Sequence, residues 1–361
     1  MADAVAAPVR RPRGIGADWA LWVRQRLDLL AAIALFALIY LVYQFNHPKG
    51  FTSQVFIQNA NEAFALALVS MAQTVPALMA GLDLSVGAIM TLVGCLASYL
   101  VSGGPGEIVL GLVLCVLAGA ACGFVNGCVV VYGRIQPIIA TLATGAVYIG
   151  LALFLRPTPG GKVDEDLSWA VTSDVAEFAA TFGFEGAFDN PWLTPIGVLP
   201  VPLVLLALIV LLVWVPFNRT ITGRTVYAIG SSEGAAYMSG LPLDRAKLAA
   251  FTLAGLFAGL GGLFLALQTS SGNADLPQAG AYTLNSIAAV VIGGTSLLGG
   301  SGGVVGSIIG AFVLRTISFN FRIFDVDPLL QPLFEGLVLL VAVSLSGLSM
   351  LRLTNRLEVF R

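Results

Sequence analysis

FALALVSMAQTVPALMAGLDLSVGAIMTLVGCLASYLVS, residues 64–102, is the stretch of sequence that decides the fold, because it holds 39 residues with a single charge, Asp83. A membrane-spanning helix needs about 20 apolar residues. As one helix, this stretch would be about 58 Å long, roughly twice the hydrocarbon thickness of a bilayer. It must therefore cross the membrane twice, and the turn is expected at 81–87, where turn formers meet a candidate helix N-cap.

The neighbouring apolar runs behave in the same way. Residues 108–155 contain only Arg134 as a charge and turn at 132–137, and residues 281–314 contain no charge and break at 299–303. The whole chain of 361 residues is 57% hydrophobic and 11% charged, whereas ordinary soluble domains carry about 25% charged residues. The sequence therefore predicts an all-α, polytopic membrane protein with ten spans, expected at 29–45, 61–80, 84–103, 107–132, 137–155, 198–216, 246–268, 281–299, 303–321 and 328–348.

The distribution of basic residues predicts the orientation of these spans. With the N-terminus inside, the cytoplasmic segments collect 13 of the 18 Lys and Arg residues, as the positive-inside rule requires. The predicted periplasmic loop, 156–197, has two basic residues and seven acidic ones. The basic tail 1–26 favours an uncleaved first span over a signal peptide. We therefore expect a transmembrane domain at 27–350 between cytoplasmic tails at 1–26 and 351–361.

The order of the spans indicates an inverted repeat. Spans 2–5 start outside and spans 7–10 start inside, and each block has one Gly/Ser-rich interruption, at 81–87 and at 299–303. Inverted repeats with broken helices recur in transporters. Glycines also recur every fourth residue, at 119, 123 and 127 and again at 255 and 259, which predicts faces where helices approach closely.

The cytoplasmic loop 217–247 contains the most informative polar stretch. Ser231 or Ser232 can cap a helix whose positive end Glu233 favours, and Gly240 and Pro242 can stop it. The sequence therefore predicts a short helix at about 233–239, outside the membrane. Its exposed Ala, Tyr and Met side chains suit a groove on a partner protein. An interfacial helix resting on lipid headgroups is the alternative, and the residues alone leave both open.

Charged residues inside the spans are few. Asp83 is expected to cap the third span, with or without a role in a pathway. Arg315 and Glu335 each lie about 10 Å from the outer end of a span, counted at 1.5 Å per residue. An unpaired charge at that depth is costly, so the sequence predicts that these two side chains pair. A structural pair is favoured over a gate.

Several functional classes have no support in the sequence. GxxxxGK[ST] does not occur, so the chain has no P-loop with which to hydrolyse ATP. The only histidine is His47, and no Cys/His spacing fits a metal, so no metal or cofactor is expected in this chain. Intramembrane carboxylates are too few for a proton relay. The net charge of −2 gives no indication of nucleic-acid binding.

Four stretches together resemble the ribose/xylose/arabinose-type permeases of bacterial ABC importers, in the superfamily of branched-chain amino acid permeases. They are GLDLSVGAIMTLVG (81–94), GFVNGCVVVYGRIQPIIATLATGAVYIGLAL (123–153), GRTVYAIGSSEGAAYMSGLPLDRAKL (223–248) and NSIAAVVIGGTSLLGGSGGVVGSIIGA (285–311). The resemblance covers roughly residues 30–350. The sequence departs from the family's usual pattern at Asn285, where an acid is usual, and at Ser301, where a basic residue is usual.

The resemblance implies a set of partners and a mechanism. It implies a second permease copy, an ATPase subunit that binds ATP and magnesium, and a periplasmic solute-binding protein that delivers a sugar-like solute. It also implies that loop 217–247 carries the coupling helix that docks on the ATPase. The predicted coupling residues are Ser231, Glu233, Ala235, Ala236, Tyr237 and Gly240.

Alternating access between two permease copies is the expected mechanism. Polar residues near the helix breaks are the candidates for the pathway: Asp83, Ser85, Asn126, Thr141, Asn285 and Thr295. For each of them, a role in packing or capping alone is the favoured alternative. An ion-coupled secondary transporter and a membrane scaffold without a transport role are the alternatives from other classes. A permease of the same class for amino acids or polyols is a third possibility.

Overall fold

The computed structural model describes residues 27–330 except Asp189, together with residues 333, 334, 336, 337, 340 and 344. The regular structure in this part of the chain is helical, and the described residues form two isolated β-bridges, Gly160–Gly272 and Asp174–Pro200, but no strand. The predicted all-α fold is therefore confirmed. The tails 1–26 and 351–361, and Glu335, lie outside the described residues.

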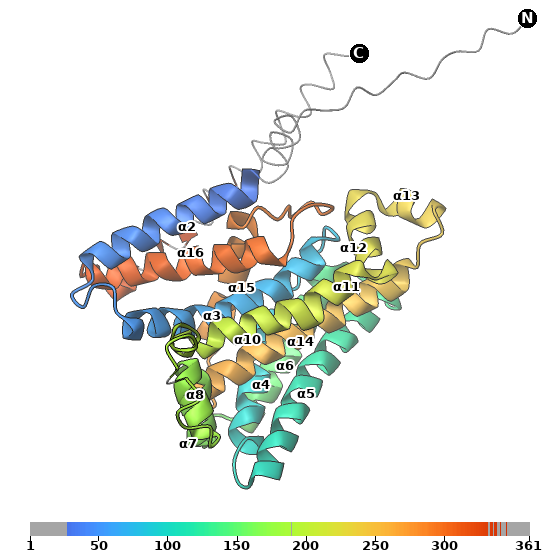
Figure 1. The fold of residues 1–361 in the computed structure, drawn as a ribbon. Coiled ribbons are helices and arrows are strands. Elements are labelled where there is room, and N and C mark those ends of the chain that lie inside the picture. The colour runs from blue at the N-terminus through green and yellow to red at the C-terminus, as the bar shows by residue number, and fades with distance from the viewer. Residues whose placement is uncertain are drawn as a thin grey trace, which may run out of the picture.

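Nine helical segments match the first nine predicted spans (Figure 1). Seven are long and apolar enough to cross a membrane, and two, α4 and α15, are apolar but shorter. The tenth span, expected at 328–348, falls largely outside the described residues. The matching helices are α2 (Leu27–Asn46), α3 (Ser53–Ala77), α4 (Val86–Leu100), α5 (Pro105–Val131), α6 (Pro137–Leu155), α10 to α11 (Val201–Arg219), α14 (Leu243–Thr269), α15 (Leu276–Ile292) and α16 (Val304–Ile323).

The sixth span is made of three helical pieces. They are α10 (Val201–Ile209), a π-helical turn (Val210–Trp214) and α11 (Val215–Arg219). Pro216 has no N–H to donate to the preceding turn, and a π-turn just before it accommodates that loss without ending the helix. The span therefore continues to Arg219, and the next helix begins at Ile221.

Shorter elements lie at the two ends of the bundle. One end carries α7 (Glu165–Thr172), α8 (Val175–Thr181), α9 (Thr194–Gly197) and the short 3₁₀ turn Pro328–Leu330. The other end carries α12 (Ile221–Ser231) and α13 (Glu233–Met238). We call these the α7 end and the α13 end.

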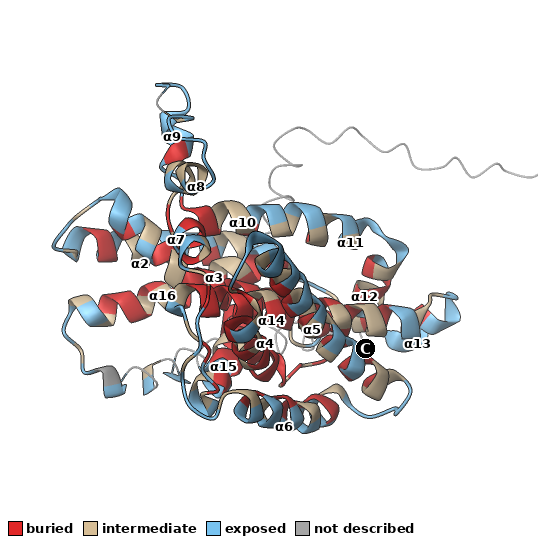
Figure 2. Cartoon of the chain, turned by 90° about the horizontal axis from the view of Figure 1, so that it is seen from below, coloured by how far each residue is buried: buried red, intermediate tan, exposed pale blue. Residues whose placement is uncertain are grey.

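An inner group of helices is surrounded by an outer group. In an 18-residue stretch of α3 and of α14, 72% and 67% of the residues are buried, against 22% in α5 and 28% in α6. Figure 2 shows this as buried ribbon concentrated in α3, α4 and α14. The outer helices expose leucine, isoleucine and valine side chains over most of their length, as helices that face lipid do.

Glycines hold α5 directly against α14, which confirms the predicted packing face. A Cβ atom on Gly255 would lie 2.4 Å from the carbonyl oxygen of Gly119 and 2.6 Å from Cα of Gly123. A Cβ on Gly119 would likewise lie 2.8 Å from Cα of Gly259. The two backbones therefore touch, as in other small-residue contacts between membrane helices.

The packing of the inner helices has the pattern of an inverted repeat. α3 packs against α14, α15 and α16, and α14 packs against α3, α4 and α5. Exchanging α3, α4 and α5 with α14, α15 and α16 converts one set of neighbours into the other. α3 ends and α14 begins at the α13 end, so the two halves run in opposite directions.

The connections between helices are also tied together at both ends. At the α13 end, the amide of Gly300 donates to the carbonyl of Leu78 (3.0 Å), which joins the α15–α16 connection to the α3–α4 connection. At the α7 end, Gly160 exchanges two backbone hydrogen bonds with Gly272 (3.0 and 2.8 Å), and the amide of Asp164 donates to the carbonyl of Val101 (2.8 Å). Residues 160–164 thus form a strap across the α14–α15 and α4–α5 connections.

This arrangement shows how the two predicted interruptions are related. The sequence predicted one Gly/Ser-rich interruption in each block, at 81–87 and at 299–303, and these two interruptions are not equivalent positions of the repeat. They lie at the same end of the bundle, because Leu78 and Gly300 are hydrogen-bonded. In an inverted repeat, equivalent positions lie at opposite ends. The α3–α4 connection therefore corresponds to the α14–α15 connection, and the α15–α16 connection to the α4–α5 connection.

Candidate functional site

The predicted short helix in loop 217–247 is present as α13, Glu233–Met238. The hydroxyl of Ser232 accepts a hydrogen bond from the amide of Ala235 (3.3 Å), so Ser232, and not Ser231, is the N-cap. Ser231 ends α12 and donates to the carbonyl of Tyr227 (3.0 Å). Gly240 follows α13 with a φ of +72°, a left-handed conformation that favours glycine at a helix C-terminus.

Most side chains of α13 point away from the protein. Tyr237 is 72% exposed and Met238 is 84% exposed, whereas Ala236 is buried against the protein. Ala235, Ser231 and Gly240 are exposed as well. Two large apolar side chains on a short helix that projects from a membrane bundle form the kind of surface that docks into a groove.

An ion pair ties the start of α13 to α14. Nζ of Lys247 lies 2.5 Å from Oε1 of Glu233. A cleft of about 810 Å³ lies beside this pair, between the α3–α4 connection, the α5–α6 connection, α12 and α14. The charged side chains along the cleft are those of Arg134, Glu233, Asp244 and Lys247.

Four of the six predicted pathway residues meet in one buried cluster. Asp83, Ser85, Asn126 and Thr141 all have no exposed surface. The carboxylate of Asp83 accepts hydrogen bonds from the amide (2.9 Å) and the hydroxyl (2.6 Å) of Ser85. Nδ2 of Asn126 donates to Oγ of Ser85 (2.7 Å), and the hydroxyl of Thr141 accepts from the amide of Leu84 (2.9 Å). The cluster therefore joins the α3–α4 connection to α5 and α6.

Two members of this cluster were missed by sequence reasoning. The hydroxyl of Tyr148 donates to Oδ1 of Asn126 (3.1 Å). The side-chain amide of Gln73, oriented to satisfy both partners, donates to the carbonyl of Asp83 (2.8 Å) and accepts from its amide (3.3 Å). A signal was available for Gln73, since it is a fully polar residue inside a long apolar span. No sequence pattern indicates that Tyr148 contacts Asn126, which lies 22 positions earlier in the chain.

The other two predicted pathway residues lie elsewhere. The hydroxyl of Thr295 is buried, accepts from the amide of Gly303 (3.0 Å) and lies 3.4 Å from Oγ of Ser307. The hydroxyl of Thr74 donates to the same Ser307 oxygen (2.7 Å), so this second polar group joins α3 to the α15–α16 connection. Asn285 is half-buried on α15.

Arg315 can be placed, but its predicted partner cannot, because Glu335 lies outside the described residues. The guanidinium of Arg315 lies 5.2 Å from the centre of the Tyr282 ring, within the range of a cation–π contact. Its Nε is buried and has no hydrogen-bond partner within the described part of the chain. The predicted pairing with Glu335 stays a prediction.

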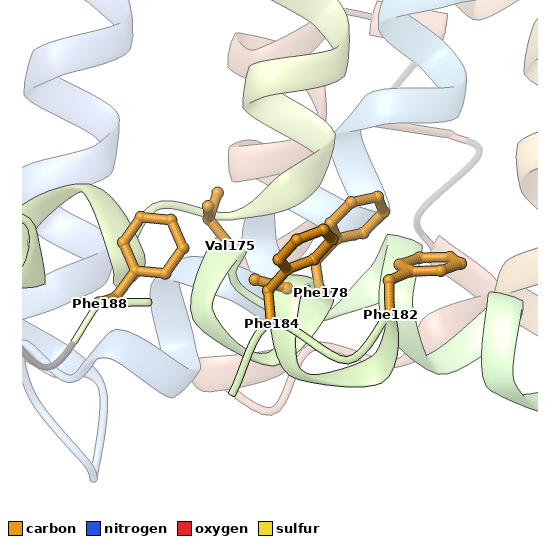
Figure 3. A pocket seen from close by; sticks show the side chains of 6 residues that line it. Val175, Phe178, Phe182, Phe184 and Phe188 are labelled. Carbon is orange, nitrogen blue, oxygen red and sulfur yellow. The ribbon is translucent and has the colours of Figure 1, made fainter. Parts of the chain in front are cut away.

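A second hollow, of about 550 Å³, lies on the loop at the α7 end (Figure 3). Its lining side chains are Val175, Phe178, Ala179, Phe182, Phe184 and Phe188. Binding sites for small polar ligands need a few well-placed polar groups, and the described residues that line this hollow are all apolar. This lining gives no support for a sugar site in the hollow. Among the described residues, no group of three His, Cys, Asp or Glu side chains could hold a metal ion.

Comparisons with known proteins agree with this architecture. The family described as "Branched-chain amino acid transport system / permease component" matches residues 55–343. The ribose import permease protein of Escherichia coli (strain K12) is 31% identical over 323 residues, which are 89% of this chain and 93% of that protein. The ribose import permease protein of Bacillus subtilis (strain 168) is 35% identical over 315 residues, 87% of this chain and 90% of that protein.

A fructose import permease protein of Rhizobium meliloti is 31% identical over 322 residues, 87% of this chain and 84% of that protein. No solved structure matches the chain. The family match extends over most of the bundle, and each relative is aligned along almost its whole length. The chain therefore belongs to this family of transport permeases, and it is a multi-pass membrane subunit of a transport system.

Proposed function

We propose that this chain is the permease subunit of an ATP-binding cassette importer that carries a monosaccharide, or a similar small polar solute, across the inner membrane of a bacterium. The observation that carries the proposal is the aligned similarity to permeases named for the import of ribose, D-allose and fructose. The projecting helix α13 supports it, because a subunit that is driven by a partner needs a surface on which that partner acts.

The energy for transport comes, in this proposal, from a partner. The chain has no P-loop, so ATP and magnesium would be bound by an ATPase subunit. That subunit would dock on α13 and receive Tyr237 and Met238 in a groove. Glu233, Ala235, Ala236 and Gly240 would fix the shape of the docking helix, with Ser231 at the end of α12.

Further partners follow from the same proposal. The acidic loop 156–197 at the α7 end would face a periplasmic solute-binding protein, and the exposed apolar side chains of the outer helices would contact lipid and a second, identical permease copy. The pathway would run between the two copies. Asp83, Ser85, Asn126, Thr141, Asn285 and Thr295 would line it, and the buried cluster would become accessible only when α6 moves away from α4.

Reconstitution tests this function. Proteoliposomes containing the chain, its ATPase subunit and its binding protein should accumulate D-ribose when ATP is present. Uptake driven by a proton or sodium gradient without the ATPase would instead support a secondary transporter. Accumulation of an amino acid or a polyol, and not of ribose, D-allose or fructose, would keep the importer class and replace the proposed solute.

The orientation of the bundle gives a separate prediction. A membrane-impermeant maleimide added to intact spheroplasts should label Phe184→Cys at the α7 end and should not label Met238→Cys at the α13 end. Both side chains are well exposed, so the difference reports the side of the membrane. The reverse pattern would contradict the predicted orientation, and lysed cells in which both positions react provide the control.

The docking role of α13 gives a further prediction. Glu233→Lys places two ammonium groups where the ion pair with Lys247 now lies, so the start of α13 should be displaced from α14. We expect much less ATPase subunit to co-purify with this variant, together with a matching loss of uptake. Glu185→Lys, the same charge change in the loop at the α7 end, should co-purify normally. Undiminished co-purification of the Glu233→Lys variant would contradict the assignment.

A further inference from the structure

One backbone hydrogen bond links the two polar groups described above. The amide of Gly300 donates to the carbonyl of Leu78. Leu78 follows the last residue of α3 and leads to Asp83, whose cluster joins the α3–α4 connection to α5 and α6. Gly300 belongs to the α15–α16 connection, in which Thr295 accepts from Gly303. Any change in this hydrogen bond therefore affects the connections that hold both groups.

The end of α12 lies directly against this hydrogen bond. A Cβ atom on Gly230 would lie 2.0 Å from the carbonyl oxygen of Leu78, 2.3 Å from the amide nitrogen of Gly300 and 2.9 Å from the carbonyl carbon of Gly299. All three atoms belong to the backbone, so no side chain could turn aside to make room. Glycine is the only residue that lets α12 approach so closely.

The α15–α16 connection is shaped to receive α12. Gly299 and Gly300 have φ values of +85° and +74°, which favour glycine. A Cβ on Gly299 would lie 2.7 Å from Cα of Gly230, and a Cβ on Gly300 would lie 2.6 Å from the Ser231 hydroxyl. The hydroxyl of Tyr227, one turn earlier in α12, donates to the carbonyl of Gly302 (3.2 Å). A tyrosine hydroxyl is protonated at neutral pH, and burial raises the pKa of Tyr227 further.

α13 packs on α12, and the second tie between α13 and the bundle is the ion pair of Glu233 with Lys247. A force applied to α13 therefore reaches α14 through this ion pair and through residues 239–242, and it reaches the α3–α4 and α15–α16 connections through the end of α12. Because the contact there is between backbone atoms, no side chain can change its rotamer to accommodate a displacement of α12. The two connections must then move when α12 moves.

We propose that Gly230, Gly299 and Gly300 are positioning residues through which α12 moves the α3–α4 and α15–α16 connections together when a partner displaces α13. This inference rests on the proposed function, in which the partner is the ATPase subunit. It adds that the end of α12, and not only the docking helix α13, determines how ATP hydrolysis is coupled to transport.

The test compares Gly230→Ala with Gly150→Ala in the complete complex in proteoliposomes, with D-ribose as the probe. Gly150 lies on α6, where a Cβ would meet nothing within 4 Å. The measured quantity is ribose imported per ATP hydrolysed. Coupling between sites typically corresponds to about 5–150-fold, and we expect Gly230→Ala to lower this ratio at least about tenfold. The ATPase subunit should still co-purify. Gly150→Ala should keep the wild-type ratio.

Tyr227→Phe keeps the proposal testable if Gly230→Ala does not fold. It removes only the hydrogen bond to Gly302, and one such bond corresponds to a shift of about fivefold in an equilibrium. We expect the ratio to fall by about that factor, with an unchanged yield of complex. A defect in folding alone would lower uptake and ATP hydrolysis in proportion to the yield and leave the ratio unchanged, which would overturn the proposal.

A second measurement needs no solute, so it separates this inference from the proposed function. Spin labels at Tyr132→Cys and Leu298→Cys, both well-exposed positions near the α13 end, are introduced after replacement of the four native cysteines. ATP with vanadate should change the distance between the labels in the complex, and Gly230→Ala should abolish that change. A change as large in Gly230→Ala as in Gly150→Ala would overturn the inference, whatever solute the complex carries.

Discussion

Gly255→Ala should yield little folded protein, whereas Gly150→Ala should fold as the wild type does. The added methyl group on Gly255 would lie 2.4 Å from the carbonyl oxygen of Gly119 and 2.6 Å from Cα of Gly123. Both are backbone atoms of α5, so α5 and α14 must separate along the contact between their glycines. Overpacking a tight core typically costs about 1–3 kcal/mol, and a contact between two backbones should reach or exceed the upper end of that range.

Thermal unfolding in detergent, followed by the monodisperse fraction on size exclusion, measures this effect. Gly150→Ala is the matched control, because the same methyl group enters open space on a helix and should be neutral or stabilising by up to about 1 kcal/mol. Equal melting temperatures for the two variants would show that α5 and α14 do not pack as described.

Asp83→Ala should abolish uptake and lower the melting temperature, while Asp83→Asn should preserve much of both. Asp83 accepts from the amide and the hydroxyl of Ser85 in a site with no exposed surface. Alanine leaves these donors without their acceptor, and each buried unsatisfied group costs about 1–3 kcal/mol. Asparagine keeps an acceptor oxygen in nearly the same position.

Uptake of D-ribose by the reconstituted complex and thermal unfolding of the purified chain provide the two readouts. Loss of uptake in both variants with normal melting temperatures would assign a role to the negative charge itself. Full activity of Asp83→Ala would show that the cluster does not hold the α3–α4 connection in a form that transport needs.

The spans could be predicted because they depend on a local property of the sequence. A charge-free run longer than one bilayer thickness must turn, so residues 64–102 predict both α3 and α4. The predicted ends of the spans were less accurate than their order. The eighth span was expected at 281–299, but α15 is Leu276–Ile292, because Pro277 can enter the first turn of a helix and the chain leaves the helix at Gly293.

The contacts between spans could not be predicted, because they depend on tertiary packing. Asn126 is hydrogen-bonded to Ser85, which lies 41 positions earlier in the sequence, and Thr74 is hydrogen-bonded to Ser307, which lies 233 positions later. A local sequence pattern cannot predict contacts between residues so far apart in the chain. The α13 helix was predictable because its cap, its acidic first residue and its terminating glycine are adjacent in the sequence. The close backbone contact at Gly230 could not be predicted, since nothing in the sequence distinguishes this residue from the other glycines among the 41.

The strap of residues 160–164 has a consequence for the permeability barrier of the cell. It spans the connections that are related, through the inverted repeat, to the pair joined by Leu78 and Gly300, so each end of the bundle has its own backbone tie. In the proposed transport cycle, these two ties would act as closures. The two closures are built from different parts of the chain and can be released separately. Since either closure alone keeps the bundle shut, a weakened strap should let small ions leak only while the tie between Leu78 and Gly300 is also released.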